Sequence, residues 1–557
     1  MPTAPIDTAR CALGLWDGHD AGAALVVEGR VVAAVSEERL MRTKRQAGFP
    51  RRAVVEVLRL AGLGPSQVQA IGIAGQYGRA PARLLDERYA SLDPREIDPL
   101  DWSSRLFAQY QHTVAGLPGV RAVERLVGVR ALSHSLAECG LGAAPVRAWD
   151  HHLCHALGAA ARGPLPALVM TADGYGDGLS AAVWRATARG PAGLQRLATY
   201  GPSSSLALLY GAATRVLGFA EGEEGKVTGL AAAGDAMRSG SAGVGQWVRS
   251  EAGQVRVDLP AAVATLRKAI AAGAQRSDVA ADVQRAVQAA TVRWVQHWLG
   301  TTGLVHLAVA GGLFANVSIN GALLDSGCAT LTVCPAMGDQ GLCVGAALAS
   351  AGSLADQPWS SLRLGTDIAA GAGPDPEVVA EALAGGEVWG IARGPMEFGP
   401  RALGGRSILC DPRQRRAVDD LNARLGRDTF MPLGPVLPVE AWPAMTPVPW
   451  SRMPASAADM TVAVPVRPAF AELAPAVVHL DSTARPQAVD PSVDPWLHTV
   501  LVSFAARTGC PALVNTSFNR HGEPIVCTGD EARATARATR LDAVVVGDAV
   551  ERLAARS

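Results

Sequence analysis

The chain has 557 residues, of which 49% are hydrophobic, and its 51 basic side chains are balanced by 51 acidic ones. This length predicts two or more domains with cores of their own, and the neutral balance argues against binding of nucleic acid or a membrane surface through bulk charge. The sequence contains no uninterrupted apolar run of membrane-spanning length, and its start lacks the features of a secretory signal. The nine cysteines form no CxxC pair. We therefore expect a cytoplasmic protein.

The first predicted elements are a strand, a turn and a hairpin. They are "CALGLW" (11–16), "DGHDAG" (17–22) and "AALVVEGRVVAAV" (23–35), which bends at Glu28-Gly29. A similar unit returns in "PALVMTADGYGDGLSAAVWRA" (166–186), where we place the turn at Asp173-Gly174. Two hairpins with acidic, Gly-rich tips suit a phosphate cradle, because Gly admits close backbone approach and Asp can hold a cation. Two ordinary Asp-Gly turns are the alternative.

Between these hairpins, the stretch "VRAWDHHLCHALGAA" (146–160) places His151 and His155 four residues apart. This spacing is close to one helical turn, so both imidazoles would project from one helix face and could offer two nitrogen ligands to a metal. The pair could instead cap the helix or complete a buried polar network. His152 follows His151 where the zinc-protease pattern HExxH requires Glu, so a protease of that type would lack its general base.

A long helix is expected at about 278–299, followed by two strand–loop–helix units at 304–327 and 329–352. Gly-rich loops between strand and helix hold nucleotides in many α/β folds. We expect a first domain at 1–357, a linker at 358–376 and a second domain, again mixing strands and helices, at 377–557. A Pro- and Met-rich loop at 441–460 interrupts the second domain.

Lysine is scarce in this chain. Only Lys44, Lys226 and Lys268 occur among the 51 basic residues. Where Arg replaces Lys so widely, a surviving Lys suggests a need for its compact ammonium group, although chance survival is the alternative.

Several stretches, in the same order along nearly the whole chain, resemble the O-carbamoyltransferases of antibiotic and nodulation-factor biosynthesis. They are "HDAGAALVVEGRVVAAVSEERLMRTKRQAGFP", "DHHLCHA", "DGYGDG", "EGKVTGLAAAG", "GGLFANVSIN", "GDQG", "GPMEFGPRALGGRSIL", "DSTARPQAV" and "NTSFNRHGEPIV". The resemblance implies an α/β protein with a duplicated, actin-like ATPase-fold N-terminal domain and a YrdC-like C-terminal domain.

The resemblance also implies a reaction in two steps. The C-terminal domain would make carbamoyl adenylate from carbamoyl phosphate and ATP. In the N-terminal domain, a hydroxyl of a small-molecule acceptor would then attack this mixed anhydride and release AMP. Activation is needed because carbamate is a poor electrophile until its oxygen joins a good leaving group, and the hydroxyl needs a base. A homodimer is left open.

For the N-terminal domain, the resemblance implies a metal centre, a base and a basic residue. The metal ligands would be His151, His155, Asp173 and Asp339. The family points to iron, whereas the ligand types alone suit Zn²⁺ or Mn²⁺ equally. His19 matches the proposed general base, with a turn His bonded to its own backbone as the alternative. Lys44 matches the basic residue near the transferred group.

The resemblance also implies residues that contact the nucleotide or phosphates. In the N-terminal domain these are Gly174, Gly311, Gly312 and Asn316; in the C-terminal domain they are Arg401, Arg406, Arg485 and Asn515. Two of them have structural alternatives: Asn316 as a helix cap and Arg406 as part of an ion pair. Arg suits phosphate because its planar fork of donors matches phosphate oxygens.

One motif departs from the family. "NARLGRDTFMPLGP" (422–435) is one residue short, lacks the expected Lys, and has Met431 in place of an expected Arg. We predict that Arg424 or Arg427 supplies the lost charge; a decayed adenylating site is the alternative. Other classes left open are an actin-like ATP-binding regulator without transfer activity and a metallohydrolase built on the His pair.

Overall fold

The computed structural model describes residues 11–76, 117–238, 243–368, 371, 373–428 and 433–553. The chain forms two compact units. The first runs to Ser360 without Arg42–Lys44, and the second comprises Ser361 onward together with Arg42–Lys44.

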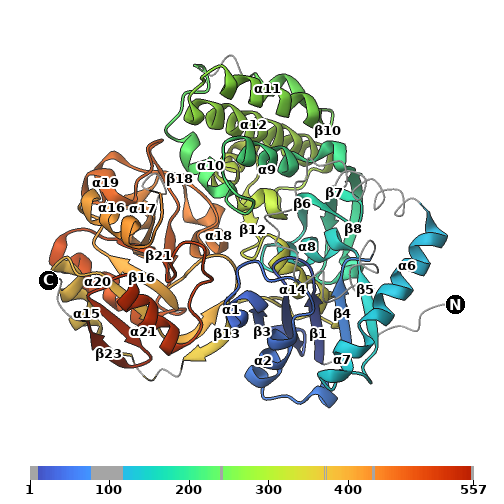
Figure 1. Ribbon diagram of the computed structural model, residues 1–557, viewed down its shortest axis with the longest axis horizontal. Helices are drawn as coiled ribbons and strands as arrows, with labels where there is room; N and C mark the ends of the chain where they lie inside the picture. The colour runs from blue at the N-terminus through green and yellow to red at the C-terminus, as the bar shows by residue number, and fades with distance from the viewer. Residues whose placement is uncertain are drawn as a thin grey trace. The chain divides into compact units, whose positions relative to one another are not determined.

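The first unit contains two five-stranded sheets of identical topology (Figure 1). The first sheet has the order β3-β2-β1-β4-β5 and consists of β1 (Cys11–Trp16), β2 (Gly22–Val27), β3 (Arg30–Ser36), β4 (Ala70–Ala74) and β5 (Val146–Trp149). The second has the order β8-β7-β6-β11-β12 when read from its other edge, and consists of β6 (Ala167–Gly176), β7 (Leu179–Ala186), β8 (Leu194–Tyr200), β11 (His306–Ala310) and β12 (Thr330–Val333).

Strand direction repeats as well as strand order. In each sheet the first three strands are antiparallel neighbours, and the last two run parallel to the first strand. This is the duplicated arrangement of the actin-like ATPase fold, so the expected fold of the N-terminal part is confirmed.

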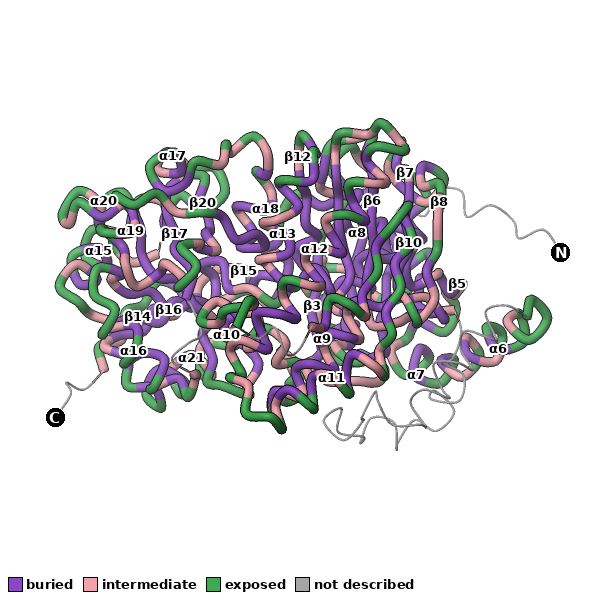
Figure 2. The backbone as a smooth tube through the Cα atoms, turned by 90° about the horizontal axis from the view of Figure 1, so that it is seen from above, coloured by how far each residue is buried: buried purple, intermediate pink, exposed green. Residues whose placement is uncertain are grey.

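Two helices of the first unit each follow one sheet in the chain and pack on the other sheet. Helix α8 (His151–Ala160) follows the first sheet but packs on β6 and β11 of the second, whereas α14 (Leu342–Ser350) follows the second sheet and packs on β1 and β4 of the first. The two helices also pack on each other. Both are buried along their lengths. Helix α6 (Pro118–Ala131), by contrast, is largely exposed (Figure 2).

Glycines allow this packing to be close. A Cβ on Gly14 of β1 would lie 2.0 Å from the carbonyl oxygen of Cys343, and one on Gly345 would lie 2.1 Å from that of Cys154. These obstacles are helix backbone, which cannot rotate away as a side chain could.

We predict that Gly14→Ala lowers the free energy of unfolding by about 1–3 kcal/mol, because the added methyl overpacks the β1–α14 contact. Gly300→Ala is the matched control: it lies in a helix with nothing within 4 Å of its added Cβ and should stabilise by about 0.5–1 kcal/mol. Urea unfolding of both variants measures the difference. Equal stability of Gly14→Ala and the parent would contradict the packing account.

The remaining elements of the first unit are α1 (Glu37–Met41), α2 (Arg51–Ala61), α7 (Ser133–Glu138), α9 (Leu206–Val216), α10 (Glu224–Ala231), β9 (Val248–Glu251), β10 (Gln254–Val257), α11 (Leu259–Ala271), α12 (Arg276–Thr302) and α13 (Val317–Leu323). Helix α12 corresponds to the helix expected at about 278–299.

The Gly-rich turn expected to begin at Asp173-Gly174 begins later in the same stretch. Strand β6 continues through Asp173 to Gly176, with an irregularity after Ala172, and the chain turns at Asp177-Gly178. Both turn residues have positive φ (51° and 78°), as the tight turns of β-hairpins require. The acidic residue at the hairpin tip is therefore Asp177, and Asp173 is a strand residue.

The second unit is built on a seven-stranded sheet of order β20-β17-β21-β16-β14-β22-β23. Its strands are β14 (Trp389–Ala392), β16 (Arg406–Cys410), β17 (Gly434–Pro438), β20 (Gln487–Val489), β21 (Leu513–Ser517), β22 (Ala543–Val546) and β23 (Ala549–Arg552). Further elements are β13 (Arg363–Ile368), α15 (Pro376–Ala384), β15 (Gly394–Glu397), α16 (Arg415–Arg424), α17 (Trp442–Met445), α18 (Pro454–Ala458), β18 (Val464–Pro465), α19 (Pro468–Leu473), β19 (Thr483–Ala484), α20 (Pro495–Thr508) and α21 (Gly529–Ala538).

Two sequence expectations need correction here. The expected linker at 358–376 contains β13, which pairs with β15. The expected loop at 441–460 contains the short helices α17 and α18. Strand β13 pairs with a strand outside the expected linker. Two of the loop's prolines, Pro443 and Pro454, stand in the first turns of α17 and α18, where the missing N–H is tolerated.

Candidate active site

Helix α8 brings the two histidines to one buried face. Asp150 caps its N-terminus by accepting a hydrogen bond from the backbone N–H of Leu153. His151 and His155 are 3% and 2% exposed. His152 points elsewhere, because its ring nitrogens bond the hydroxyl of Thr171 and the carbonyl of Leu179. It therefore serves the helix–sheet packing.

Two carboxylates from different elements meet these imidazoles. His155 Nε2 lies 3.1 Å from Asp173 Oδ2 and 3.6 Å from Asp339 Oδ1. His151 Nε2 lies 3.8 Å and 3.7 Å from the same two oxygens. One ligand atom from each of the four residues lies within 4.8 Å of every other. Asp339 stands in the short turn that opens α14, so both crossing helices contribute to the group.

The electrostatics of this group favour a cation. Burial lowers the pKa of His155, but hydrogen bonds to and charges on Asp173 and Asp339 outweigh it and raise that pKa to about 9. Burial raises the pKa of Asp173, yet the neighbouring His151 imidazole and the hydrogen bond from His155 bring it well below its ordinary value. Among the residues that the structure describes, the buried His151 Nε2 has no hydrogen-bond partner. Two imidazoles and two carboxylates are a ligand set that suits a divalent metal.

Three glycines pack closely around the ligand Asp173. A Cβ on Gly312 would lie 2.9 Å from Asp173 Oδ1, and Gly311 has φ 104° with its Cβ position 2.1 Å from the carbonyl oxygen of Ala172. The backbone N–H of Gly174 donates to Asp173 Oδ1 at 2.7 Å. These three glycines, expected to line a nucleotide, thus all lie against Asp173 or the residue before it.

Asp177 was missed by sequence reasoning. Its carboxylate accepts hydrogen bonds from the backbone N–H groups of His151 and Gln76. An acidic side chain at a helix N-terminus is favourable, and here it fixes the start of α8. The second Asp-Gly of "DGYGDG" was the available signal.

His19 lies beside the same group. Its Nε2 is 3.4 Å from Asp339 Oδ2, and its Nδ1 is 3.0 Å from Asp20 Oδ2. Partial desolvation lowers the pKa of His19, but the Asp339 charge and the hydrogen bond and charge of Asp20 raise it to about 9. A cation held by Asp339 would offset that effect. The half-exposed ring thus faces carboxylates, while its backbone carbonyl accepts a bond from the Trp16 indole.

Two basic residues that follow α1, Lys44 and Arg45, are assigned to different units. Lys44 is exposed and is assigned with Arg42 and Thr43 to the second unit, so its predicted role near the transferred group stays a prediction. Arg45, which sequence reasoning did not select, belongs to the first unit and donates to Glu221 Oε1 at 3.2 Å. Its neighbour Gln46 accepts a bond from Ala21, close to the turn that carries His19.

Asn316 serves as a helix cap. Its Oδ1 accepts from the N–H of Ile319 at the start of α13, and its amide exchanges hydrogen bonds with Gln284. The side chain therefore has the capping role given as the alternative, and its contact with a nucleotide stays a prediction.

In the second unit, the charge of Arg485 acts on two further buried arginines, Arg401 and Arg427. Burial lowers the pKa of Arg401 well below its ordinary value, and the charge of Arg485 adds to this effect. Burial and Arg485 likewise lower the pKa of Arg427 to about 10, and burial lowers that of Arg485 to about 10. Mutual repulsion among desolvated guanidinium groups is relieved when an anion binds. The group is thus suited to phosphate.

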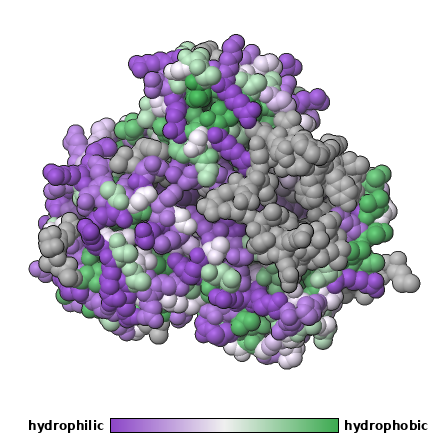
Figure 3. Space-filling model, viewed as in Figure 1, coloured by the Kyte–Doolittle hydropathy of each residue, from purple (hydrophilic) through white to green (hydrophobic). Residues whose placement is uncertain are grey.

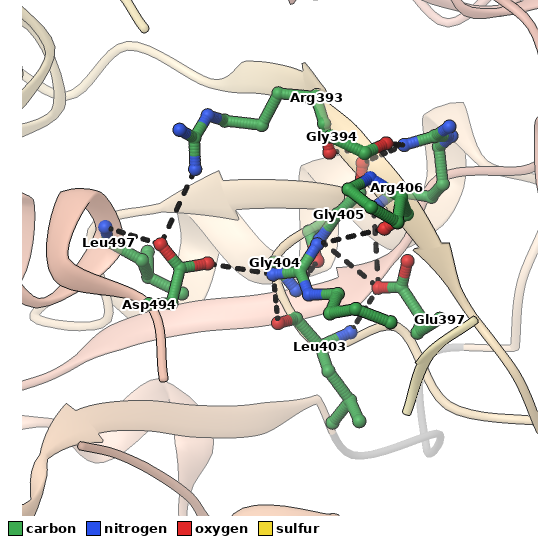
Figure 4. A network of polar contacts seen from close by, with 12 residues as sticks. Arg393, Gly394, Glu397, Leu403, Gly404, Gly405, Arg406, Asp494 and Leu497 are labelled. Atoms are coloured by element: carbon green, nitrogen blue, oxygen red, sulfur yellow. Dashed lines mark hydrogen bonds and ion pairs between the residues drawn. The ribbon is translucent and has the colours of Figure 1, made fainter. Parts of the chain in front are cut away.

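Arg406 is a structural residue, which corrects the expectation that it contacts phosphate. It is fully buried and donates to the carbonyl oxygens of Thr366, Arg393, Gly394, Gly405 and Cys527. Its backbone N–H also bonds Glu397, in a network that extends through the neighbouring ion pair of Arg393 and Asp494 (Figure 4). Its guanidinium therefore holds loops together around β16.

The side chains of Arg424 and Arg427 bond to different parts of the second unit. Arg424 donates to the carbonyl of Arg540 and pairs with Asp420 on its own helix. Arg427 donates to the hydroxyl groups of Thr516 and Ser517 on β21. Because the charge of Arg485 acts on Arg427, Arg427 is the better candidate for the charge missing from the motif. Met431 lies outside the described residues.

Two surface features bear on possible partners. The described surface is mainly hydrophilic on the face seen in Figure 3. None of the helices in the described ranges is both long and apolar enough to traverse a lipid bilayer.

Comparison with known proteins assigns both parts of the chain. Residues 11–348 match the family described as Carbamoyltransferase N-terminus, and residues 380–552 match Carbamoyltransferase C-terminus. The chain is 33% identical to nodulation protein NolNO of Sinorhizobium fredii, over 95% of this chain and 78% of that protein. It is also 33% identical to nodulation protein NolO of Bradyrhizobium diazoefficiens, over 72% of this chain and 78% of that protein.

A solved structure, component A of (R)-2-hydroxyglutaryl-CoA dehydratase from Acidaminococcus fermentans, is 15% identical and covers 61% of this chain and 96% of its own, with a TM-score of 0.36. This score is too low to support a fold assignment, which comes here from the strand order of the two sheets. The matches to both family regions agree with the ordered motifs along the sequence. The chain belongs to the carbamoyltransferase family and is a transferase.

Proposed function

We propose that this carbamoyltransferase acts on a hydroxyl of a small-molecule acceptor, with carbamoyl phosphate as donor, ATP as cosubstrate and carbamoyl adenylate as intermediate. The observation that carries the proposal is the convergence of His151, His155, Asp173 and Asp339 beside His19. A base next to a cation site suits attack of a neutral hydroxyl on a mixed anhydride.

Activation is assigned to the second, YrdC-like unit. Water first cleaves carbamoyl phosphate into carbamate and phosphate. A carbamate oxygen then attacks the α-phosphorus of ATP, and pyrophosphate leaves. Arg401, Arg427 and Arg485 supply the positive charge that such phosphates require.

Transfer is assigned to the first unit. His19 Nε2 accepts the proton of the acceptor hydroxyl as the hydroxyl oxygen bonds to the carbamoyl carbon, and AMP leaves. Asp20 lies on the other ring nitrogen and keeps the imidazole oriented. His151, His155, Asp173 and Asp339 would hold a divalent metal, which supplies Lewis-acid stabilisation of negative charge when bound. Iron follows from the resemblance, whereas zinc and manganese suit the same ligands.

The test is incubation of the full-length, metal-loaded protein with carbamoyl phosphate, ATP and a panel of sugars, polyols and aromatic alcohols, followed by mass spectrometry. A carbamate ester that forms only when both carbamoyl phosphate and ATP are present supports the proposal. ATP binding without ester or pyrophosphate would instead support the regulatory alternative. Ester formation only from added carbamoyl adenylate would indicate a decayed second unit.

A cytoplasmic location is also proposed. All nine cysteines lie among the described residues and are free thiols, as expected in a reducing compartment.

We predict that Arg427→Ala weakens pyrophosphate release from ATP and carbamoyl phosphate by about 10–100-fold in kcat/KM. The reason is the loss of a charge-assisted hydrogen bond of about 1.5–3 kcal/mol. Arg424→Ala, whose side chain bonds Arg540 and Asp420, is the matched control and should change the rate less than about threefold. A larger loss in Arg424→Ala would reverse the assignment.

A further inference from the structure

One loop of the second unit carries Arg401 and is closed at its base by a buried carboxylate. The loop leaves β15 at Glu397 and enters β16 at Arg406. Glu397 is 1% exposed, and its Oε1 accepts hydrogen bonds from the backbone N–H groups of Leu403, Gly405 and Arg406 (Figure 4). One oxygen atom therefore holds residues 403–406, the closing turn, which follows Arg401 in the loop.

Arg363 holds the closing turn through a carbonyl group. It pairs with Glu397 across strands β13 and β15, and its Nη2 donates to the carbonyl oxygen of Leu403 at 3.2 Å. Leu403 is therefore held at its N–H by an anion and at its C=O by a cation. A Cβ on Gly405 would lie 2.1 Å from Arg363 Nη1 and 2.6 Å from Glu397 Oε2, so glycine is needed there to leave room for both charged groups.

The residue next to Arg401 is also tied to the sheet. Asn515 lies on β21, which pairs with β16, and is 1% exposed. Its Nδ2 donates to the carbonyl oxygen of Ala402 at 3.0 Å. The backbone of the loop is thus held from Ala402 onward, whereas a contact of Asn515 with a nucleotide or phosphate stays a prediction.

Glu397 holds the closing turn as an anion. Burial raises its pKa, but the charge of Arg363 and the hydrogen bond from the N–H of Leu403 outweigh burial and bring the pKa below its ordinary value. Hydrogen bonds to a charged acceptor are stronger than those to a neutral one. The closure of the loop therefore depends on the negative charge of Glu397 as well as on its shape.

Arg401 needs such support because its position is electrostatically unfavourable. Burial and the charge of Arg485 both lower its pKa, which means that both act against the charged guanidinium. A loop that carries this side chain would gain free energy by moving the charge toward water unless other contacts hold it. A loop that is fixed beforehand presents the guanidinium to phosphate without the entropic cost of ordering it during binding.

We propose that Glu397 is a positioning residue for Arg401: its carboxylate, together with Arg363, fixes the closing turn and so preorganises Arg401 for binding phosphate. The inference rests on the proposed function, which assigns Arg401 to phosphate, and it adds a residue that acts without touching the substrate. Loss of the negative charge at Glu397 should therefore weaken phosphate binding through Arg401 and through no other group.

A double-mutant cycle tests this dependence, with binding of pyrophosphate to the full chain measured by calorimetry in the absence of turnover. Glu397→Gln keeps the shape of the side chain but removes its charge, and it should weaken binding about 10-fold. In an Arg401→Ala background, Arg427 and Arg485 remain to bind the probe, and the same substitution should cost less than about twofold. Losses that add in the double variant would indicate a general structural effect and would overturn the proposal.

Two further variants separate positioning from folding. Asp548→Asn alters another carboxylate of this unit, one that accepts the backbone N–H groups of Gly371 and Gly373, and should keep the pyrophosphate affinity within about twofold. If Glu397→Gln lacks a cooperative melting transition, Ser407→Ala takes its place in the same cycle, because the Ser407 hydroxyl accepts the N–H of Gly404 in the closing turn.

The outcomes also distinguish this inference from the function on which it rests. Absence of pyrophosphate binding by wild type would contradict the phosphate role of Arg401 and would overturn the inference with it. Binding by wild type with additive losses, or an equal loss in Asp548→Asn, would overturn the positioning role of Glu397 alone.

Discussion

His155→Ala is expected to abolish metal binding and carbamoyl transfer together. His155 Nε2 has the shortest contact to Asp173 in the four-residue group, and its ring is almost fully buried. Truncation leaves three of the four ligands. Two of these are the carboxylates of Asp173 and Asp339, which then face each other with one imidazole fewer to compensate their charge. Loss of residues that merely support a ligand already costs about 10–100-fold in affinity or activity, so we expect at least about 100-fold here.

Metal content by mass spectrometry and ester formation measure this effect in the same preparation. His134→Ala is the control, since its side chain is 85% exposed and lies outside the four-residue group; it should retain metal and activity. Transfer at the wild-type rate by a metal-free His155→Ala protein would exclude a role for the metal in transfer.

Arg401→Ala and His19→Ala are expected to fail at opposite steps. Arg401 belongs to the arginine group of the second unit, so its loss should stop pyrophosphate release yet leave transfer from supplied carbamoyl adenylate intact. His19 lies in the first unit beside Asp339, so its loss should leave pyrophosphate release intact and slow transfer. Removal of a general base typically costs about 10²–10⁴-fold.

Quenched-flow measurement of each half-reaction separates these effects. An unchanged transfer rate in His19→Ala, under conditions where chemistry limits turnover, would remove the base assignment. Loss of both half-reactions in either variant, with its melting temperature preserved, would contradict the division of work between the units.

The architecture could be predicted from the sequence because local strand, turn and helix patterns and the ordered motifs agree with one another. The two hairpins indicated an internal repeat, the motif resemblance implied a duplicated α/β domain, and the two sheets of the first unit have the same strand order. Sequence reasoning also selected the four residues that come within 4.8 Å of one another. The i, i+4 histidines needed only helix geometry, but Asp173 and Asp339 came from motif resemblance, because spacing does not indicate which carboxylates meet them.

The misses arose where distant partners determine a role. Arg406 carries a side chain typical of phosphate contacts, but its guanidinium donates to backbone carbonyls of distant segments. Asn316 has the capping role that the sequence offered as an alternative. A one-dimensional pattern contains no information about such acceptors. Asp177 was passed over for the same reason, since its partners are backbone N–H groups from two other segments.

The most direct test of the account is the stoichiometry of ATP cleavage during transfer. With an acceptor in hand, α-³²P-labelled ATP is supplied to the metal-loaded protein. AMP and ADP are counted from the label, and pyrophosphate and carbamate ester are measured by a coupled assay and mass spectrometry in the same reaction. The account predicts one AMP and one pyrophosphate for each ester, with none formed when carbamoyl phosphate is omitted. Formation of ADP in place of AMP, or ester without ATP cleavage, would contradict transfer through carbamoyl adenylate.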